Sequence, residues 1–241
     1  RHPDYPGRRQ SRQHHARRRA LISVTISQPV TYRLATNLAV TSAVNGIEVR
    51  ANDVTIEMGG HTLSGGQVGR NGIASFNRNT KVEHGTVRGF TNDGVRSIAQ
   101  FLSVNDMVIT ANGRNGVFAD GNASVFSNAV SFASIVGSKV SVNAIEGIQC
   151  GQNCRVENSA VSSNGGYGIY FRGTGGLALG NIVTDNGTGI FFWTYGGAGN
   201  NTVLLNGNGA QITGSYLAMQ PNACNPACPP PVAPCSKANA C

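Results

Sequence analysis

The clearest pattern along the chain is a short motif in which a glycine precedes an aliphatic residue and a run of alternating positions. It begins at Gly46, Gly72, Gly94, Gly116, Gly147, Gly168, Gly189 and Gly209, with gaps of 26, 22, 22, 31, 21, 21 and 20 residues. A second series of short apolar segments lies between these motifs, as at Val54–Ile56, and Asn or Asp commonly follows. No segment sustains the apolar spacing of a helix. The period of about twenty residues therefore predicts a repeat architecture built from strands.

Two or three strands of three to five residues cannot bury an apolar face alone, but stacked coils can. Each inward aliphatic side chain then lies about 4.8 Å from its equivalent in the next coil. Asn suits the corners, where it tolerates a left-handed backbone and can bond its equivalent along the stack. We predict an all-β parallel β-helix of about 8–9 coils over residues 46–219, with N-terminal strands or a cap over 21–45. The gap of 31 residues predicts a shortened extra coil around Ser134–Val136.

The segment from Asn52 to Gly65, NDVTIEMGGHTLSG, resembles a known protein family. It is similar to the first full coil of the right-handed parallel β-helix repeat proteins of the pectin-lyase-like superfamily. Later Asn-Gly-Ile segments match the same repeat, and the resemblance covers roughly residues 30–215. It implies a right-handed parallel β-helix. It leaves function open among lyases, hydrolases, epimerases and non-catalytic proteins, because one fold hosts many activities.

Charge is concentrated at one end of the chain. The net charge is +8, yet residues 1–20 hold seven Arg and one acid, so the other 221 residues carry only +2. We expect residues 1–20 to be a disordered basic tail. The tail is either an electrostatic tether to acidic polysaccharide, anionic lipid or nucleic acid, or a propeptide or mis-assigned start. A dedicated nucleic-acid function is not expected, because the body lacks a basic groove with stacking aromatics.

Cysteine usage favours an oxidising compartment. The chain has an even number of cysteines: Cys150, Cys154, Cys224, Cys228, Cys235 and Cys241. The last four crowd the proline-rich segment 220–241, which we interpret as a disulfide-stapled tail or cap, with a zinc site as the weaker alternative. The first two lie within one coil, either bridged across a corner or present as buried thiols.

Targeting features agree with export. No apolar run is long enough to span a membrane, and residues 1–20 lack the apolar core of a signal peptide. We therefore expect a mature secreted or cell-surface protein that needs no metal or cofactor.

Candidate catalytic groups are sparse. Neither an Asp-rich hydrolase-like set nor a lyase-like set of acids with Arg or Lys is present in the sequence. Glu83, His84 and Asp106 come nearest, because they lie about one coil apart and a carboxylate pair with His can do acid–base chemistry. The alternative is that all three are solvated residues on an outer face.

A column of aromatic residues gives the stronger lead. The residue two positions after each glycine should point outward, which places Phe118, Tyr170 and Phe191 in one stripe, with Trp193 next to it. Asp120 and Arg172 should lie beside the stripe. Exposed aromatics at this density indicate sugar stacking or a protein–protein contact, unless residues 198–241 fold back over them.

These features favour a non-catalytic extracellular protein that self-associates, with filaments as one form, or binds polysaccharide. The uncapped ends of a β-helix and interchain disulfides would serve self-association. The alternative function is a polysaccharide lyase or hydrolase of the same superfamily.

Overall fold

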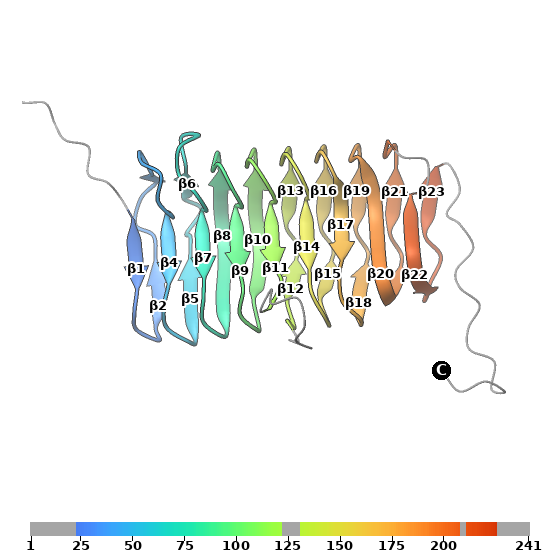
Figure 1. The fold of residues 1–241 in the computed structure, drawn as a ribbon, viewed down its shortest axis with the longest axis horizontal. Coiled ribbons are helices and arrows are strands. Elements are labelled where there is room, and N and C mark those ends of the chain that lie inside the picture. The colour runs from blue at the N-terminus through green and yellow to red at the C-terminus, as the bar shows by residue number, and fades with distance from the viewer. Residues whose placement is uncertain (1–22, 122–130, 208–210, 226–241) are drawn as a thin grey trace, which may run out of the picture.

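The computed structural model describes residues 23–121, 131–207 and 211–225, and this part of the chain contains strands and no α-helix. The strands wind into one elongated solenoid (Figure 1), and every strand pairing is parallel. Each turn contributes to three faces, and the described residues make nine turns. The parallel β-helix predicted from the repeat is confirmed. No helix in the described ranges is long and apolar enough to cross a membrane.

Strand pairing defines the three faces. Face 1 contains β1 (Val24–Ile26), β4 (Ile47–Val49), β7 (Ile73–Ser75), β9 (Val95–Ser97), β11 (Val117–Ala119), β14 (Ile148–Cys150), β17 (Tyr167–Phe171) and the first parts of β20 (Thr188–Gly199) and β22 (Ile212–Ala218). Face 2 contains β2 (Thr31–Arg33), β5 (Val54–Glu57), the first parts of β8 (Thr80–Arg88) and β10 (Ser103–Thr110), β12 (Ser134–Val136), β15 (Arg155–Glu157), β18 (Gly176–Leu179) and the second parts of β20 and β22. Face 3 contains β3 (Leu38–Ala39), β6 (Thr62–Ser64), the second parts of β8 and β10, β13 (Lys139–Ser141), β16 (Ala160–Ser162), β19 (Ile182–Thr184), β21 (Thr202–Leu204) and β23 (Ala223–Asn225).

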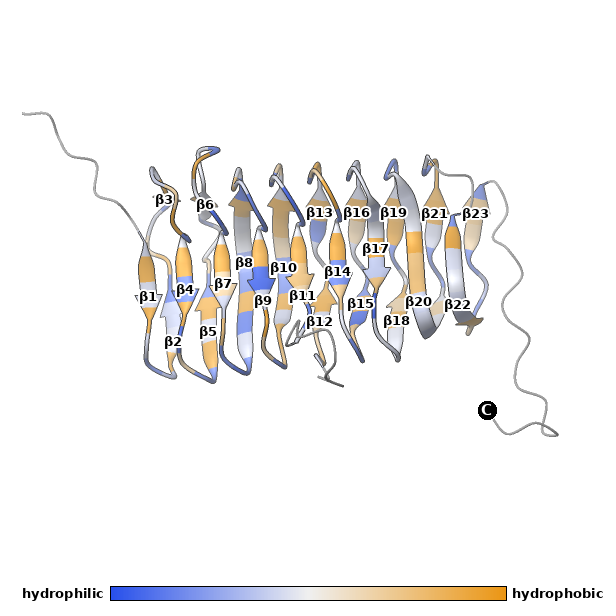
Figure 2. Cartoon of the chain, in the orientation of Figure 1, coloured by the Kyte–Doolittle hydropathy of each residue, from blue (hydrophilic) through white to orange (hydrophobic). Residues whose placement is uncertain are grey.

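The core lies inside the coil and consists of columns of equivalent residues. On face 1 one inward column is buried throughout: Ile47, Ile73, Val95, Val117, Ile148, Ile169, Ile190 and Ile212. The first seven directly follow the glycine of the repeat, whereas Ile212 lies three positions after Gly209. Hydrophobic positions recur in the same strands coil after coil (Figure 2). The alternation read from the sequence therefore placed the inward positions correctly from Ile47 to Ile190. It was wrong in the last coil, where Gln211, expected to point outward, is buried and Ile212 pairs with Ile190.

The corners are held by left-handed residues and by side-chain ladders. At the corner between faces 2 and 3 the positive-φ positions include His84, Asp106, Gly137, Asn158, Gly180 and Asn200. Between faces 3 and 1, buried amides bond one another along the stack at 2.7–3.0 Å, in the order Asn112, Asn143, Asn164, Asn186, Asn206 and Gln211. The predicted bonding of stacked Asn residues is confirmed.

The predicted extra coil around Ser134–Val136 is wrong. Strand β12 pairs with β10 on one side and β15 on the other, as an ordinary member of face 2. The gap of 31 residues thus spans a single turn that is longer than its neighbours. Part of that turn, residues 122–130, lies outside the described residues.

Candidate functional site

A row of aromatic side chains lies on the outer side of face 1 in its last coils. We call Tyr167, Tyr170, Phe191 and Trp193 the aromatic row. Tyr170 pairs with Phe191 in register, and their rings lie 5.5 Å apart. The Tyr167 ring stacks on Phe191 at 5.0 Å, and Trp193 meets Phe191 edge-on at 6.2 Å. Trp193 keeps 65% of its surface exposed, so the row ends in an open indole face.

Phe118 does not belong to this row, which corrects the expectation of an exposed stripe through that residue. It is only 6% exposed. The Arg96 guanidinium lies 4.3 Å above its ring, in a cation–π contact from the preceding coil. Gln149 separates Phe118 from Tyr170 in the column. The aromatic row is therefore formed by residues of β17 and β20, and exposed aromatics elsewhere in the described residues, Phe76, Phe101 and Phe132, lie outside it.

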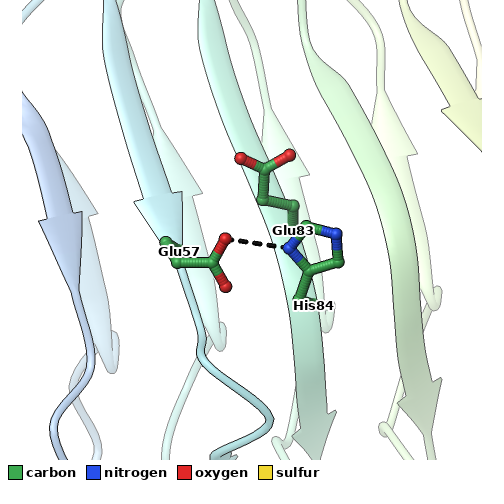
Figure 3. A group of neighbouring side chains, drawn as sticks. All are labelled: Glu57, Glu83 and His84. Carbon is green, nitrogen blue, oxygen red and sulfur yellow. Dashed lines mark hydrogen bonds and ion pairs between the residues drawn. The ribbon is translucent and has the colours of Figure 1, made fainter.

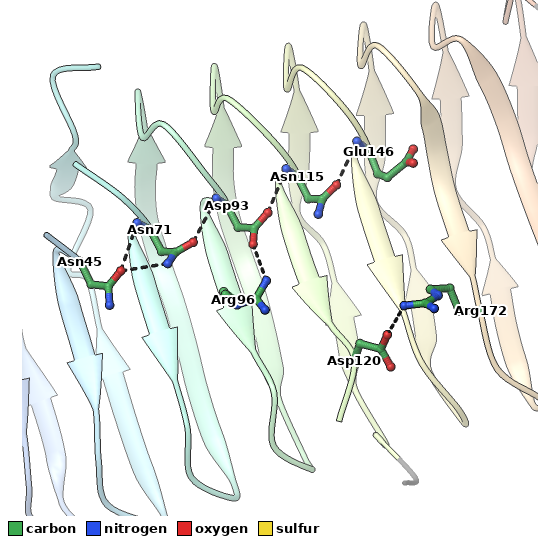
Figure 4. A network of polar contacts seen from close by, with 8 residues as sticks. All are labelled: Asn45, Asn71, Asp93, Arg96, Asn115, Asp120, Glu146 and Arg172. Carbon is green, nitrogen blue, oxygen red and sulfur yellow. Dashed lines mark hydrogen bonds and ion pairs between the residues drawn. The ribbon is translucent and has the colours of Figure 1, made fainter. Parts of the chain in front are cut away.

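Asp120 and Arg172 flank the row as an ion pair. Their side chains meet at 2.7 Å, although one coil lies between them. That coil presents Gly151, where an added Cβ would lie 2.9 Å from the Asp120 Oδ1. The missing side chain therefore leaves room for the carboxylate beneath Arg172. The predicted neighbourhood of the two residues is present, and Figure 4 shows their contact.

Three ion pairs among the described residues of face 1 have the same orientation. In the pairs Arg50–Glu48, Arg96–Asp93 and Arg172–Asp120, the guanidinium is exposed by 59%, 28% and 49%, whereas the carboxylate is exposed by 18%, 1% and 16%. The basic partner therefore lies outermost each time. Face 1 presents cations to solvent although its nearby acids balance them.

A polar ladder borders face 1 on the side where its strands begin (Figure 4). Its members are Asn45, Asn71, Asp93, Asn115 and Glu146, and each side chain accepts a backbone N–H from the following coil. The last acceptor, Glu146, receives the N–H of Tyr167 and so lies at the edge of the aromatic row. Burial raises the pKa of Glu146, and it also raises the pKa of Tyr170.

A second polar group lies elsewhere, at the corner between faces 2 and 3. Here His84 Nδ1 contacts Glu57 Oε2 at 2.8 Å (Figure 3). On the other side of the ring, His84 Nε2 lies 3.7 Å from Asp106 Oδ2. Glu83 bonds Lys81 at 2.5 Å. The hydrogen bond with Glu57 raises the pKa of His84, and the same bond lowers the pKa of Glu57.

The spacing in the sequence predicted that Glu83, His84 and Asp106 lie near one another, and the structure places them so. It did not predict Glu57 as the partner of the imidazole. Glu57 pairs with Glu83 in register. The extra corner residues Gly59 and Gly60 lengthen that coil, so that Glu57 and His84 lie 27 positions apart. Aligning the strands rather than counting residues would have revealed the contact. This group does not face the aromatic row, so the two candidate sites are separate.

The cysteines divide into two sets. Cys150 and Cys154 form a disulfide, as one of the two sequence interpretations predicted. Cys224 lies in β23 and is disulfide-bonded. Cys228, Cys235 and Cys241 lie outside the described residues.

Comparisons with known proteins identify the fold. A scan against protein-family models and a search of curated proteins found no match. Among solved structures, the A-module of the mannuronan C-5 epimerase AlgE6 from Azotobacter vinelandii matches with a TM-score of 0.62 at 15% identity, over 80% of this chain and 56% of that one. The periplasmic alginate epimerase AlgG matches with a TM-score of 0.60 at 12% identity, over 75% and 47%.

The Dettilon tailspike protein gp208 also matches, with a TM-score of 0.50 at 12% identity, over 85% of this chain and 51% of that one. The chain therefore has the parallel β-helix fold that these proteins share. At these identities the likeness establishes the fold alone. The chain also spans only about half the length of these proteins.

Proposed function

We propose that this protein is an extracellular polysaccharide-binding protein that holds a glycan along face 1, across the aromatic row. The observation that carries the proposal is the open Trp193 indole at the end of a row of ring contacts. Large exposed aromatics on a soluble protein indicate a binding surface. The Cys150–Cys154 disulfide supports a location outside the cytoplasm.

The chemistry of the row suits a sugar chain. Pyranose rings have apolar C–H faces that stack on aromatic rings, and Phe191 and Trp193 offer two rings in different orientations. In the ion pairs of face 1 the guanidinium group is more exposed than its carboxylate partner, and guanidinium ions bind carboxylates in pairs of hydrogen bonds. An anionic polysaccharide therefore fits better than a neutral one. The solved proteins of the same fold named for mannuronan and alginate support this choice.

Affinity electrophoresis tests the proposal with gels that contain alginate, polygalacturonate or a neutral glucan. We expect retardation by at least one polyuronate. Trp193→Ala should weaken binding about tenfold, which corresponds to losing about 1.4 kcal/mol. Arg172→Gln should weaken binding of the polyanion alone. Ile182→Ala, which truncates an apolar residue 55% exposed on face 3, is the matched control and should bind as the wild type does.

Two results would overturn this function. One is the absence of binding across a broad panel of acidic and neutral polysaccharides. The other is equal binding by the Trp193→Ala and wild-type proteins, because the glycan would then lie elsewhere on the solenoid.

A second candidate is head-to-tail self-association, favoured by apolar surface at both ends of the described solenoid. The first coil leaves a cavity of about 270 Å³, lined mainly by apolar side chains that include Val24, Tyr32 and Leu38. The last coils expose Leu217 and Met219. Because all strands are parallel, the first coil of one copy could continue the last coil of another. Sedimentation velocity across a concentration series tests this candidate, which a strictly monomeric protein would exclude.

A third candidate is cleavage of the bound chain, favoured by Glu146 at the edge of the aromatic row. Its raised pKa keeps a protonated carboxyl available at higher pH than usual, as acid catalysis requires. Incubation with each polyuronate, followed by assays for new reducing ends and unsaturated ends, tests it. Activity that Glu146→Gln retains would rule this residue out.

A further inference from the structure

The corner group at His84 has a geometry that the proposed glycan face does not use. Glu57 and Glu83 each offer a carboxylate oxygen and His84 offers a ring nitrogen, and these three atoms all lie within 4.8 Å of one another. Figure 3 shows the three side chains on the same outer side of β5 and β8. Atoms at this spacing can close around one ion with small side-chain rotations.

The backbone explains why these three side chains share a side. Glu57 and Glu83 are register partners on adjacent strands, so both point outward. In regular strand geometry the next residue, His84, would point inward. Its φ of 57° interrupts the alternation and brings the imidazole outward beside Glu83. This conformation recurs at the same corner in other coils, as at Asp106, Asn158 and Asn200.

The donor set selects the kind of ion. One imidazole nitrogen with two carboxylate oxygens matches zinc, whereas calcium and magnesium prefer oxygen ligands alone. Three protein ligands leave further coordination positions for water. We propose that Glu57, Glu83 and His84 form a Zn²⁺ site in which His84 binds through Nδ1.

A second and independent observation supports the site. A zinc-bound histidine usually donates its other ring N–H to a carboxylate, which fixes the tautomer. Asp106 is the carboxylate near this place, because its Oδ2 lies 3.7 Å from His84 Nε2, a small shift away from hydrogen-bond distance, whereas Glu57 contacts Nδ1. Asp106 comes from the following coil and also has positive φ, at 49°. Lys81 bonds Glu83 through one oxygen and leaves the other free to bind.

The test measures zinc binding by calorimetry on the full-length chain. The five histidines of the sequence are His2, His14, His15, His61 and His84. Replacing the first three by alanine removes zinc binding by the N-terminal residues and gives the reference protein. We expect one Zn²⁺ per chain in the reference protein, without competition from excess Ca²⁺.

Variants of the reference protein then locate the ion. His84→Asn should abolish the site, and Asn keeps the fold because it tolerates a left-handed backbone. Glu57→Gln should weaken binding at least about tenfold, and Asp106→Asn about tenfold to a hundredfold. His61→Ala is the matched control and should bind unchanged. A reference protein that binds no zinc, or a His84→Asn variant that binds it equally well, would overturn the proposal. Neither result bears on glycan binding at face 1.

Discussion

Replacing Asn164 with alanine removes a central side chain of the long asparagine ladder between faces 3 and 1. In the native protein its Oδ1 accepts the backbone N–H of Asn143 at 3.0 Å and the side-chain amide of Asn143 at 2.9 Å. Its own amide donates to Asn186 Oδ1 at 2.8 Å. Asn186 Oδ1 keeps a second donor in the variant, because the backbone N–H of residue 164 remains, at 3.0 Å.

The expected cost follows from the groups that lose their partners. Two donors of Asn143 lose these acceptors, and Asn143 is only 2% exposed, so water does not readily replace them. A buried donor without a partner costs about 1–3 kcal/mol. The variant should therefore lose about 2–6 kcal/mol of unfolding free energy.

Urea unfolding followed by far-UV circular dichroism measures this loss, provided that the slope of the transition is unchanged. The matched control is Asn105→Ala, since Asn105 is half-buried on β10 and receives one hydrogen bond of 3.4 Å from Ser103. The control should stay within about 0.5 kcal/mol of the wild type. If Asn164→Ala also stays within that range, the ladder does not stabilise the solenoid in the way its geometry indicates.

Three further predictions test the core, the corners and a buried acid. Phe192→Ala should lose about 3–5 kcal/mol in urea unfolding, because its buried ring stacks on Phe171 at 4.7 Å; a loss below about 1 kcal/mol would contradict the packing. Gly116→Ala should lose about 1–3 kcal/mol, since its Cβ would lie 2.3 Å from Val140 Cγ1, whereas Gly207→Ala, with no atom nearer than 3.5 Å, should unfold like the wild type. Burial raises the pKa of Glu146 above its ordinary value, so the stability given by its protonated form is lost as pH rises through the folded-state pKa. The side chain of Glu146→Gln stays neutral at every pH. Between about pH 3.5 and about pH 7 the Tm of this variant should therefore rise relative to the Tm of the wild type. A Tm difference that does not change with pH would refute this.

Much of the fold could be predicted from the sequence, because coil stacking turns a local pattern into a global one. Ile148 and Ile169 are buried equivalents, as the position after each glycine predicts. Length alone was a poorer guide. The 31-residue gap indicated an extra coil, but strand pairing places Ser134–Val136 in the ordinary turn. Residue counts do not distinguish an added coil from a longer connection.

The candidate sites were harder to predict, because they depend on contacts between coils that alternation does not encode. Outward orientation was correct for Phe118, yet Arg96 from the preceding coil covers its ring. The reach of Arg172 to Asp120 depends on a glycine in the coil between them. In each case the residue in a neighbouring coil, Arg96 or Gly151, decides the contact, and the alternation within one strand does not show this.

The polar ladder beside face 1 gives a physical reason why an acid with a raised pKa lies next to the aromatic row. The ladder needs only an acceptor in each coil, so a carboxylate can replace an amide. Where Asp93 does so, Arg96 neutralises it at 3.0 Å. Within the described part of the chain Glu146 has no such ion pair. Burial disfavours its charged form, and its pKa is raised as a result. An acid placed only for structure would be expected to have the compensation that Asp93 has. Glu146, beside Tyr167, therefore differs from the other acid of the ladder, and this difference lies at the edge of the aromatic row.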